Sequence, residues 1–260
     1  MSLGENSLSY SVLFFFGAVL GSFLNVCIYR LPRGQSLLFP PSSCPVCKAR
    51  IKIVDLIPIV SFLLLRGKCR ACGAKIANRY LWVELLAGGV FVVGFIRFGL
   101  GFEFLRFCTL ALLLIVISFI DFEHKLILNK VTYFGMAVGL LLSPLGSDFF
   151  NACVGLVLGG GLLFAVAVVG KKVLGRDCLG GGDIKLAAMI GAFIGWKHFL
   201  LILFLGSAVG TVAGAVLILF GKMKREARLP FAPFLAVGVG LVLLLGEVLS
   251  HLPALQLFYQ

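Results

Sequence analysis

The sequence predicts an all-α polytopic membrane protein with about eight transmembrane helices and one small polar module. Three observations predict this class. Hydrophobic residues make up 60% of the 260 residues and charged residues only 13%, whereas a soluble domain is nearer half apolar and a quarter charged. Mean hydropathy is +1.10. Apolar segments of about the length of a membrane span recur along the chain, and nearly all the basic residues fall between alternate pairs of them.

Eight apolar segments are expected to form the helices, because a membrane-spanning helix needs about 20 mostly apolar residues. They are residues 8–29, 80–98, 102–120, 126–145, 149–170, 184–195, 199–220 and 231–250. The first is too long for the core of a signal peptide and no Lys or Arg precedes it, so we expect a retained helix. The sixth is short, and we expect the Gly-rich stretch before it, or tilt or re-entry, to complete its length.

The basic residues predict the orientation. With eight spans, one side of the membrane receives 20 of the 23 Lys and Arg residues, and the other side receives only Arg97, Arg106 and Lys197. Lys and Arg collect in cytoplasmic loops, so the loop at residues 30–79 is expected to be cytoplasmic and both termini to lie outside. The net charge of +12 does not indicate nucleic-acid binding, because no basic face interleaved with aromatic residues appears outside those loops.

Four of the eight cysteines form two closely spaced pairs in the predicted cytoplasmic loop. The pattern is Cys44-Pro-Val-Cys47, then 21 residues, then Cys69-Arg-Ala-Cys72. Two such pairs can place four thiolates around a tetrahedral Zn²⁺. The alternative is two disulfides or free thiols, but a cytoplasmic loop is reducing. The sequence therefore predicts a cytoplasmic four-Cys zinc-binding loop module with a structural metal, because four Cys ligands leave no open position for water.

Carboxylates at the cytoplasmic ends of the spans are the candidate chemical groups. Four of the eleven acidic residues lie there: Glu84, Asp121, Glu123 and Asp183. Asp121 ends the third span and Asp183 opens the sixth, so both are expected at the same depth on the same side. Two facing carboxylates in a low dielectric share a proton. One can then deprotonate a water while the other polarises a carbonyl, as in aspartic proteases.

Other functions are compatible with such aspartates. An intramembrane Asp can serve in an ion relay or in helix packing, and Asp183 can simply cap the sixth helix. An ion- or proton-coupled transporter using Asp121 and Asp183 as a relay is the main alternative, although such transporters usually contain internal repeats, and none is apparent between the halves. A membrane scaffold that docks through the zinc module would leave the buried carboxylates unexplained.

Seven motifs follow one another along the chain in the order of a known family. They are Gly21-Ser-Phe-Leu-Asn25 through Arg30-Leu-Pro32, the two Cys pairs, Asp55-Leu-Ile-Pro58 with Arg66-Gly67-Lys68 leading the second pair, Arg79-Tyr80-Leu-Trp-Val-Glu84, Asp121-Phe-Glu-His, Gly180-Gly-Gly182-Asp183 with Lys185, and Leu229-Pro-Phe-Ala-Pro233-Phe. With these motifs the chain resembles the bacterial type IV prepilin peptidases, also called leader peptidase/N-methyltransferases, which are Gly-X-Gly-Asp intramembrane aspartyl proteases.

The resemblance implies two activities in the bacterial inner membrane. The first is cleavage of the leader from type IV prepilins and type II secretion pseudopilins, after a Gly at the cytoplasmic face. The second is methylation of the new N-terminal residue, commonly Phe, with S-adenosylmethionine as methyl donor. These pilin precursors and the membrane lipids are the implied partners.

The resemblance also implies which residues act. It places the catalytic aspartates at Asp121 and Asp183 and a supporting motif at Gly180, Gly182 and Lys185. It links the Cys-bearing loop to methyl transfer, with Gly67, Lys68 and Glu84 as possible methyltransferase residues. The implied parts are the first transmembrane helix (1–29), the cytoplasmic zinc module linked to methyltransferase activity (30–79) and a seven-helix aspartyl protease core (80–260).

The chain departs from the family at two places. It reads Ile127-Leu128-Asn129 where the family often shows Ile-Pro-Asp, and Ala232 stands where Gly is frequent.

Overall fold

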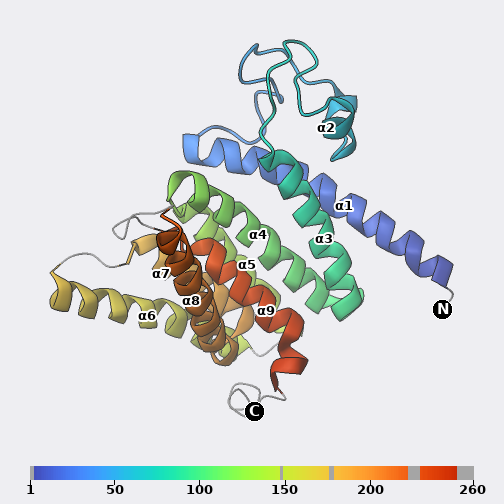
Figure 1. Cartoon of the computed structure of the whole chain (residues 1–260). Coiled ribbons are helices and arrows are strands. Elements are labelled where there is room, and N and C mark those ends of the chain that lie inside the picture. The colour runs from blue at the N-terminus through green and yellow to red at the C-terminus, as the bar shows by residue number, and fades with distance from the viewer. Residues whose placement is uncertain (1–2, 147–148, 176–178, 222–228, 251–260) are drawn as a thin grey trace. The chain divides into compact units, whose positions relative to one another are not determined.

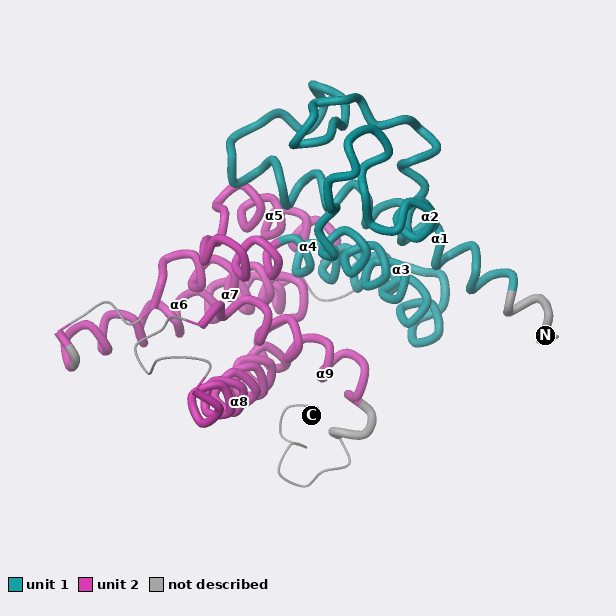
Figure 2. The backbone as a smooth tube through the Cα atoms, turned by 45° about the horizontal axis from the view of Figure 1, so that its top comes forward, with its two compact units in different colours: residues 1–116 teal, residues 117–260 magenta. Residues whose placement is uncertain are grey.

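The computed structural model describes residues 3–146, 149–175, 179–221 and 229–250 of the chain. Over these residues the regular elements are all helices, and β-type pairing is confined to two isolated bridges, Ser43 with Arg50 and Lys68 with Lys75. The chain forms two compact units, residues 1–116 and 117–260 (Figure 2). Each unit has its own helix packing.

Unit 1 is built on two long helices that approach closely, α1 (Leu3–Arg30) and α3 (Arg79–Phe98) (Figure 1). A Cβ atom on Gly17 would lie 2.6 Å from the Ala87 carbonyl oxygen, and one on Gly21 would lie 2.8 Å from the Glu84 Cα. Only glycine permits this approach, and small residues are typical where membrane helices meet. The crossing places Glu84 directly against α1.

The polar module of unit 1 connects α1 to α3. It contains two 3₁₀ turns, η1 (Leu31–Arg33) and η2 (Ile53–Leu56), and the short helix α2 (Val60–Leu64). Arg30 is largely buried and donates hydrogen bonds to the carbonyls of Ser36, at 2.9 Å, and Pro40, at 2.6 Å, which folds the chain back at the end of α1.

An ion pair holds η2 to the second Cys pair. The Arg70 guanidinium donates to both carboxylate oxygens of Asp55, with Nη2 2.6 Å from Oδ1 and Nε 2.9 Å from Oδ2. These hydrogen bonds hold the pKa of Asp55 below its usual range. The two halves of the module are thereby connected.

Unit 2 surrounds one buried helix. It consists of α5 (Asn129–Gly146), α6 (Phe149–Leu174), α7 (Gly181–Ile194), α8 (Trp196–Leu219), α9 (Ala232–Ser250) and the end of α4 (Phe102–His124). Helix α7 contacts α5, α6 and α8, and every residue from Leu186 to Ile194 is buried. The backbones of α6 and α7 touch at Gly155 and Gly191, where a Cβ atom on either would collide with the other helix.

Each of the eight predicted apolar segments coincides with one helix of 14 residues or more. Five of the described helices are long and apolar enough to cross a membrane: Leu8–Arg33, Arg79–Phe98, Phe102–His124, Phe149–Val173 and Trp196–Leu219. Helix α7, with 14 residues, extends only about 21 Å, which is less than the roughly 30 Å of the hydrocarbon core. Because its sides are covered by neighbouring helices, its length need not match the lipid.

Two helix boundaries differ from the sequence-based expectation in ways that matter for the aspartates. Helix α4 continues past residue 120 to His124, and the Lys125 N–H still bonds to the Asp121 carbonyl at 2.8 Å. Helix α7 begins at Gly181 rather than at residue 184. Asp121 therefore lies in the last turn of α4, and Asp183 lies in the first turn of α7.

Candidate functional site

Asp121 is a nearly buried carboxyl group at the end of α4. Its side chain is 6% exposed, and the preceding residues Ile117 and Ile120 are 1% exposed. The Ala232 backbone N–H, in the first turn of α9, donates to Asp121 Oδ2 at 3.0 Å, and the Phe231 backbone also hydrogen-bonds to the carboxyl group. The first N–H groups of a helix have no partner within the helix, so this carboxylate caps α9 from another element.

Asp183 is half-buried in the first turn of α7. Its Oδ2 accepts the Gly180 backbone N–H at 3.1 Å, while its own N–H donates to the Gly180 carbonyl at 3.1 Å. Asp183 is therefore not the N-cap residue considered from the sequence: Gly180 is the N-cap, and Asp183, the third residue of α7, accepts the N-cap N–H as in a capping box. This contact occupies one carboxylate oxygen, so a cap and a reacting group are compatible here.

Asp121 and Asp183 both belong to unit 2, at the end of α4 and the start of α7. The charge of Asp121 acts on Asp183 through space. Two like charges in a poorly solvated site disfavour double ionisation, so the pair holds one proton most easily. A carboxylate and a carboxylic acid that act together are the chemical components of an aspartic protease.

At two of the three glycines before Asp183 an added Cβ atom would make a close contact. A Cβ atom on Gly180 would lie 3.0 Å from Asp183 Oδ2, and one on Gly182 would lie 2.7 Å from Ile127 Cβ. Gly181 has open space around it. Gly180 thus allows the cap, and Gly182 lets the segment after α4 pass next to the start of α7.

Substituting Gly182 by Ala is expected to lower peptide cleavage by about tenfold or more, because a displacement of about 1 Å in a reacting group can cost about a hundredfold. Gly181→Ala is the matched control: it adds the same methyl group one residue earlier into open space and should stay near the wild-type rate. Initial cleavage rates of the two purified variants test this, and equal rates would contradict a requirement for the Gly182 contact.

Lys185 ties α7 to the beginning of α5. Its Nζ donates to Asn129 Oδ1 at 2.7 Å and lies 5.3 Å from the centre of the Tyr133 ring. The acceptor is the amide oxygen of the first residue of α5. Lys185 contacts α5, so it supports the position of α7.

The hydrogen-bond donors to Asp121 were not identified from the sequence. The motif Leu229–Phe234 was recognised, but a backbone N–H has no residue-type signature. The available signal was Pro233, because proline is favoured in the first turn of a helix. A helix beginning at Ala232 presents free N–H groups to whatever faces its end.

Replacing Ala232 by Pro removes the N–H that Asp121 accepts, at a helix position where proline is otherwise tolerated. A hydrogen bond to a charged group contributes about 1.5–3 kcal/mol, so cleavage should fall about ten- to a hundredfold. Ala232→Gly and Ala232→Val keep the N–H and control for flexibility and for bulk at this fully buried position. If Ala232→Val loses as much activity as Ala232→Pro, then the added volume matters and the donor does not.

The four cysteines of the module converge. All four Sγ atoms lie within 4.8 Å of one another, and those of Cys44 and Cys72 are 3.9 Å apart. Sulfurs about 2.3 Å from a tetrahedral Zn²⁺ are about 3.8 Å from each other. The cysteines are free thiols. Their arrangement fits a four-thiolate metal site and does not fit two disulfides.

The two Cys pairs repeat one backbone geometry. The Lys48 N–H donates to the Cys44 carbonyl, and the Gly73 N–H donates to the Cys69 carbonyl, each at 2.9 Å. Lys48 and Gly73 follow the second cysteine of their pairs and both have positive φ, 60° and 71°. Glycine adopts this conformation at little cost, whereas Lys48 is held in it by the turn. Each half presents its two sulfurs in the same way.

Two cysteines of the cluster have pKa values shifted in opposite directions. Backbone N–H groups of Cys47 and Val46 lower the pKa of Cys44 to about 6. The Ala74 N–H acts in the same direction on Cys72, but burial and hydrogen bonds with the neighbouring sulfurs outweigh it and raise the pKa of Cys72 to about 11. A bound divalent cation would favour the thiolate form of its ligands.

The three possible methyltransferase residues have mainly structural contacts. Gly67 has φ +63° and lies against the Phe62 ring, and its N–H bonds to the Phe62 carbonyl at 2.8 Å. Lys68 is exposed. Glu84 is 7% exposed, and its Oε2 accepts the Ile59 N–H at 2.7 Å. These contacts define no cradle for S-adenosylmethionine, so the three assignments stay predictions.

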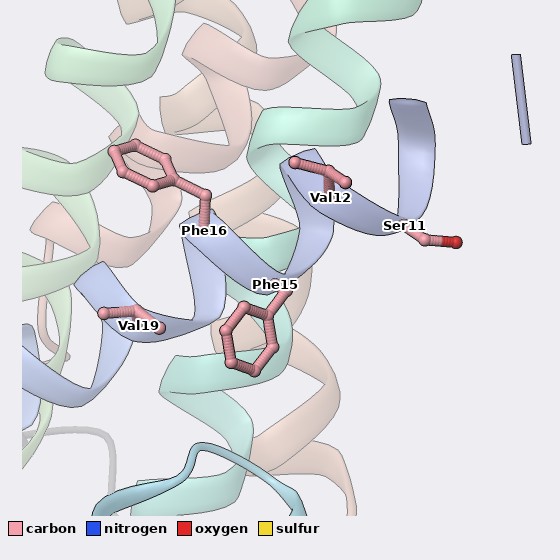
Figure 3. Close-up of a pocket in the computed structure, with 5 residues that line it drawn as sticks. All are labelled: Ser11, Val12, Phe15, Phe16 and Val19. Carbon is pink, nitrogen blue, oxygen red and sulfur yellow. The ribbon is translucent and has the colours of Figure 1, made fainter. Parts of the chain in front are cut away.

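A recess on α1 is separate from this chemistry. It is lined by Ser11, Val12, Phe15, Phe16 and Val19 (Figure 3). These side chains belong to unit 1, whereas both aspartates belong to unit 2. The recess contains no titratable group, and its phenylalanines are about half exposed. Such a surface is what a spanning helix presents to lipid.

The described residues form an all-helical fold with several helices long and apolar enough to cross a membrane. Comparison with known proteins identifies the class as a peptidase and gives its family. The model of the Type IV leader peptidase family matches residues 108–215, and that of the Bacterial Peptidase A24 N-terminal domain matches residues 15–98. The chain belongs to the type IV leader peptidase family.

Curated relatives share most of the chain. A prepilin leader peptidase/N-methyltransferase of Bacillus subtilis (strain 168) is 37% identical over 91% of this chain and 94% of its own length. Proteins of the same name from Stutzerimonas stutzeri and Myxococcus xanthus (strain DK1622) are 34% and 41% identical. The Stutzerimonas protein is matched over 90% of this chain and 90% of its own length. The Myxococcus protein is matched over 80% of this chain and 62% of its own length. No solved structure matches the chain.

Proposed function

We propose that this chain is an intramembrane aspartic endopeptidase that removes the leader from type IV prepilins and type II secretion pseudopilins, and then methylates the new N-terminal residue. The observation that carries the peptidase is that Asp121 and Asp183 both lie in unit 2, within range of an electrostatic interaction, and that each is hydrogen-bonded to the backbone at the start of a helix. The shared name of the relatives supports both activities. Neither the family nor these relatives favour the alternative of an ion- or proton-coupled transporter.

The hydrogen bonds suggest which aspartate carries the charge. Asp121 accepts backbone hydrogen bonds from Phe231 and Ala232, whereas Asp183 accepts one from Gly180. Hydrogen bonds to a carboxylate favour its charged form. We therefore assign the negative charge to Asp121 and the shared proton to Asp183.

The cleavage then follows the general aspartic-protease scheme. Asp121 takes a proton from a water as the water oxygen attacks the scissile carbonyl carbon, and protonated Asp183 transfers its proton to the carbonyl oxygen. When the tetrahedral intermediate collapses, the C–N bond breaks and the leaving amine takes the proton held by Asp121. The hydroxyl proton returns to Asp183, which restores the starting pair.

The site of cleavage fits a substrate with one apolar helix. We propose eight spans in the bacterial inner membrane, with both termini outside and the loop at residues 30–79 in the cytoplasm. The excess of Lys and Arg on that side supports this orientation. In it, the end of α4 and the start of α7 face the cytoplasm, where a leader preceding an apolar helix would be cut.

The zinc and methyl-transfer roles are proposed for residues 30–79, with residues 1–29 as the first membrane helix and 80–260 as the protease core. Cys44, Cys47, Cys69 and Cys72 would hold a structural Zn²⁺, which closes the module without an open position for water. S-adenosylmethionine would supply the methyl group, with Gly67, Lys68 and Glu84 as candidate residues. Their structural contacts suggest that they shape the module around the methyl donor.

Purified protein in lipid vesicles, supplied with a prepilin and S-adenosylmethionine, tests the proposal by mass spectrometry of the product. We expect a product that has lost its leader and gained the mass of one methyl group, and only the shortened product when the methyl donor is left out. An uncut prepilin would refute the peptidase. A cut product that never gains a methyl group would restrict the chain to proteolysis.

A further inference from the structure

An unusual apolar surface covers the part of the module between the two Cys pairs. Its side chains are exposed although they are large and hydrophobic: Ile53 is 86% exposed, Val54 59%, Leu56 41%, Ile57 40%, Val60 47%, Leu63 61% and Leu64 78%. They lie on η2, on α2 and on the turn between them, and we call residues 53–64 the apolar segment. A contiguous apolar surface of this kind marks an interaction site.

The apolar segment is fixed at the level of a membrane span. The Ile59 N–H, in the turn before α2, donates to Glu84 Oε2 at 2.7 Å. Glu84 is five residues after Arg79, where α3 and its predicted span begin, so its Cα lies about 7.5 Å along the helix. A side chain leans back towards the helix start, which places the contact beside the first turns of α3. The turn at Ile59 therefore lies beside the first turns of α3, at one end of the predicted span.

The surroundings of Glu84 agree with this depth. Trp82, two residues before Glu84, is 58% exposed on α3, and tryptophan is enriched at membrane–water interfaces. In both overall views α2 lies beside the long helices of unit 1, while the Cys-bearing loops extend away from them (Figures 1 and 2). Helix α2 of the apolar segment thus lies on the side of the module that faces these helices, while η2 contacts the second Cys pair through the Asp55–Arg70 ion pair.

The backbone at this contact is strained. Ile59 has φ +65° and ψ −54°, and the Val60 N–H bonds to the Pro58 carbonyl at 2.6 Å, which makes a γ-turn. This conformation is rare, and a residue held in such a region costs about 1–3 kcal/mol. The Glu84 carboxylate stabilises the turn by accepting its N–H. A buried carboxylate therefore holds the apolar segment against α3.

Basic residues flank the apolar segment. Lys52 precedes it, and Arg66 and Lys68 follow it, and all three side chains are exposed. The acidic residue within the segment, Asp55, is paired with Arg70. Apolar side chains beside exposed cations are the combination that binds a membrane with anionic headgroups.

We propose that the apolar segment is a membrane-interface anchor, which inserts its side chains at the headgroup–acyl boundary and docks the four-Cys module on an anionic leaflet. The occupant of the surface is lipid, because the segment is fixed beside a membrane span and its flanks are cationic. Glu84 is the positioning residue. The anchor would hold Gly67 and Lys68, which lie three and four residues after the end of α2, at the membrane surface.

Fluorescence quenching in lipid vesicles tests the anchor on the full chain. Trp82 and Trp196 are the two tryptophans and are first replaced by Phe. One tryptophan is then introduced as Leu64→Trp in the apolar segment, or as Ala71→Trp at an exposed position between Cys69 and Cys72. In vesicles containing anionic lipid, brominated acyl chains should quench the tryptophan at position 64 severalfold more than the one at position 71. Aqueous iodide should show the opposite order.

Each alternative gives a different result. Equal access of iodide to positions 64 and 71 would show that the segment lies in water and would overturn the proposal. Protection of position 64 from both quenchers would indicate a protein occupant, such as a second copy of the chain, and would also overturn it. Adding Glu84→Ala to Leu64→Trp should reduce the lipid quenching, whereas Glu84→Gln, which keeps an acceptor oxygen, should restore most of it. Unchanged quenching in Glu84→Ala would remove Glu84 from the account.

Discussion

Asp121→Asn and Asp183→Asn are each expected to lower prepilin cleavage by about a hundred- to ten-thousandfold, the usual contribution of general acid–base catalysis. An amide has the shape of the carboxyl group, and its oxygen can still accept the backbone N–H from Ala232 or from Gly180. It cannot take a proton from water or donate an acidic one. The fold should therefore persist while proton transfer is lost. Initial cleavage rates of purified variants in lipid vesicles measure the effect.

The two substitutions should not be additive. Residues that act as a unit lose nearly all of their effect with the first change, so the double variant should cleave about as slowly as either single variant. A transporter relay predicts a different outcome, because cleavage would not depend on these residues. If either single variant cuts at the wild-type rate, then the aspartate pair is not the active site.

Removal of the metal site is expected to have the second large effect. The native chain should contain about one zinc, and Cys44→Ser combined with Cys69→Ser should contain none, because each Cys pair then offers only one thiolate. Zinc binding contributes about 10–16 kcal/mol in small zinc-dependent domains. The module should therefore lose its fold. Methyl transfer should disappear, whereas cleavage by the aspartates of unit 2 should remain.

Elemental analysis of zinc and iron, together with both activities, checks this prediction. Cys108→Ser is a suitable control, since Cys108 is a buried cysteine in α4 and does not belong to the cluster. Freshly purified wild-type protein without a bound metal would contradict the zinc assignment. Loss of cleavage together with methyl transfer would contradict a separate protease core.

The sequence was sufficient for the helical elements. The lengths of the apolar segments and the distribution of Lys and Arg predicted Asp121 and Asp183 at one depth on one side, and the structure has both in unit 2, at the end of α4 and the start of α7. It also brings the four cysteines together. Both results depend on features that can be read from residue types and their positions, namely charge, apolarity and the spacing of the cysteines. The catalytic and metal-binding roles remain predictions.

Contacts made by the backbone could not be predicted. The donors of Ala232 and Phe231 to Asp121 come from peptide N–H groups, which every residue except proline possesses. The partner of Glu84 is likewise a backbone N–H, that of Ile59. Ile59 is the central residue of a γ-turn with positive φ, a conformation that a β-branched residue such as isoleucine rarely adopts.

One experiment tests the central claim most directly: Asp183→Asn protein in lipid vesicles is given full-length prepilin and pre-cleaved pilin together with S-adenosylmethionine. The mass spectrum of the mixture reports both activities at once. We predict that the prepilin keeps its leader while the pre-cleaved pilin gains one methyl group, which shows that the variant is folded and lacks only the cut. Cleavage of the prepilin by this variant would contradict the account.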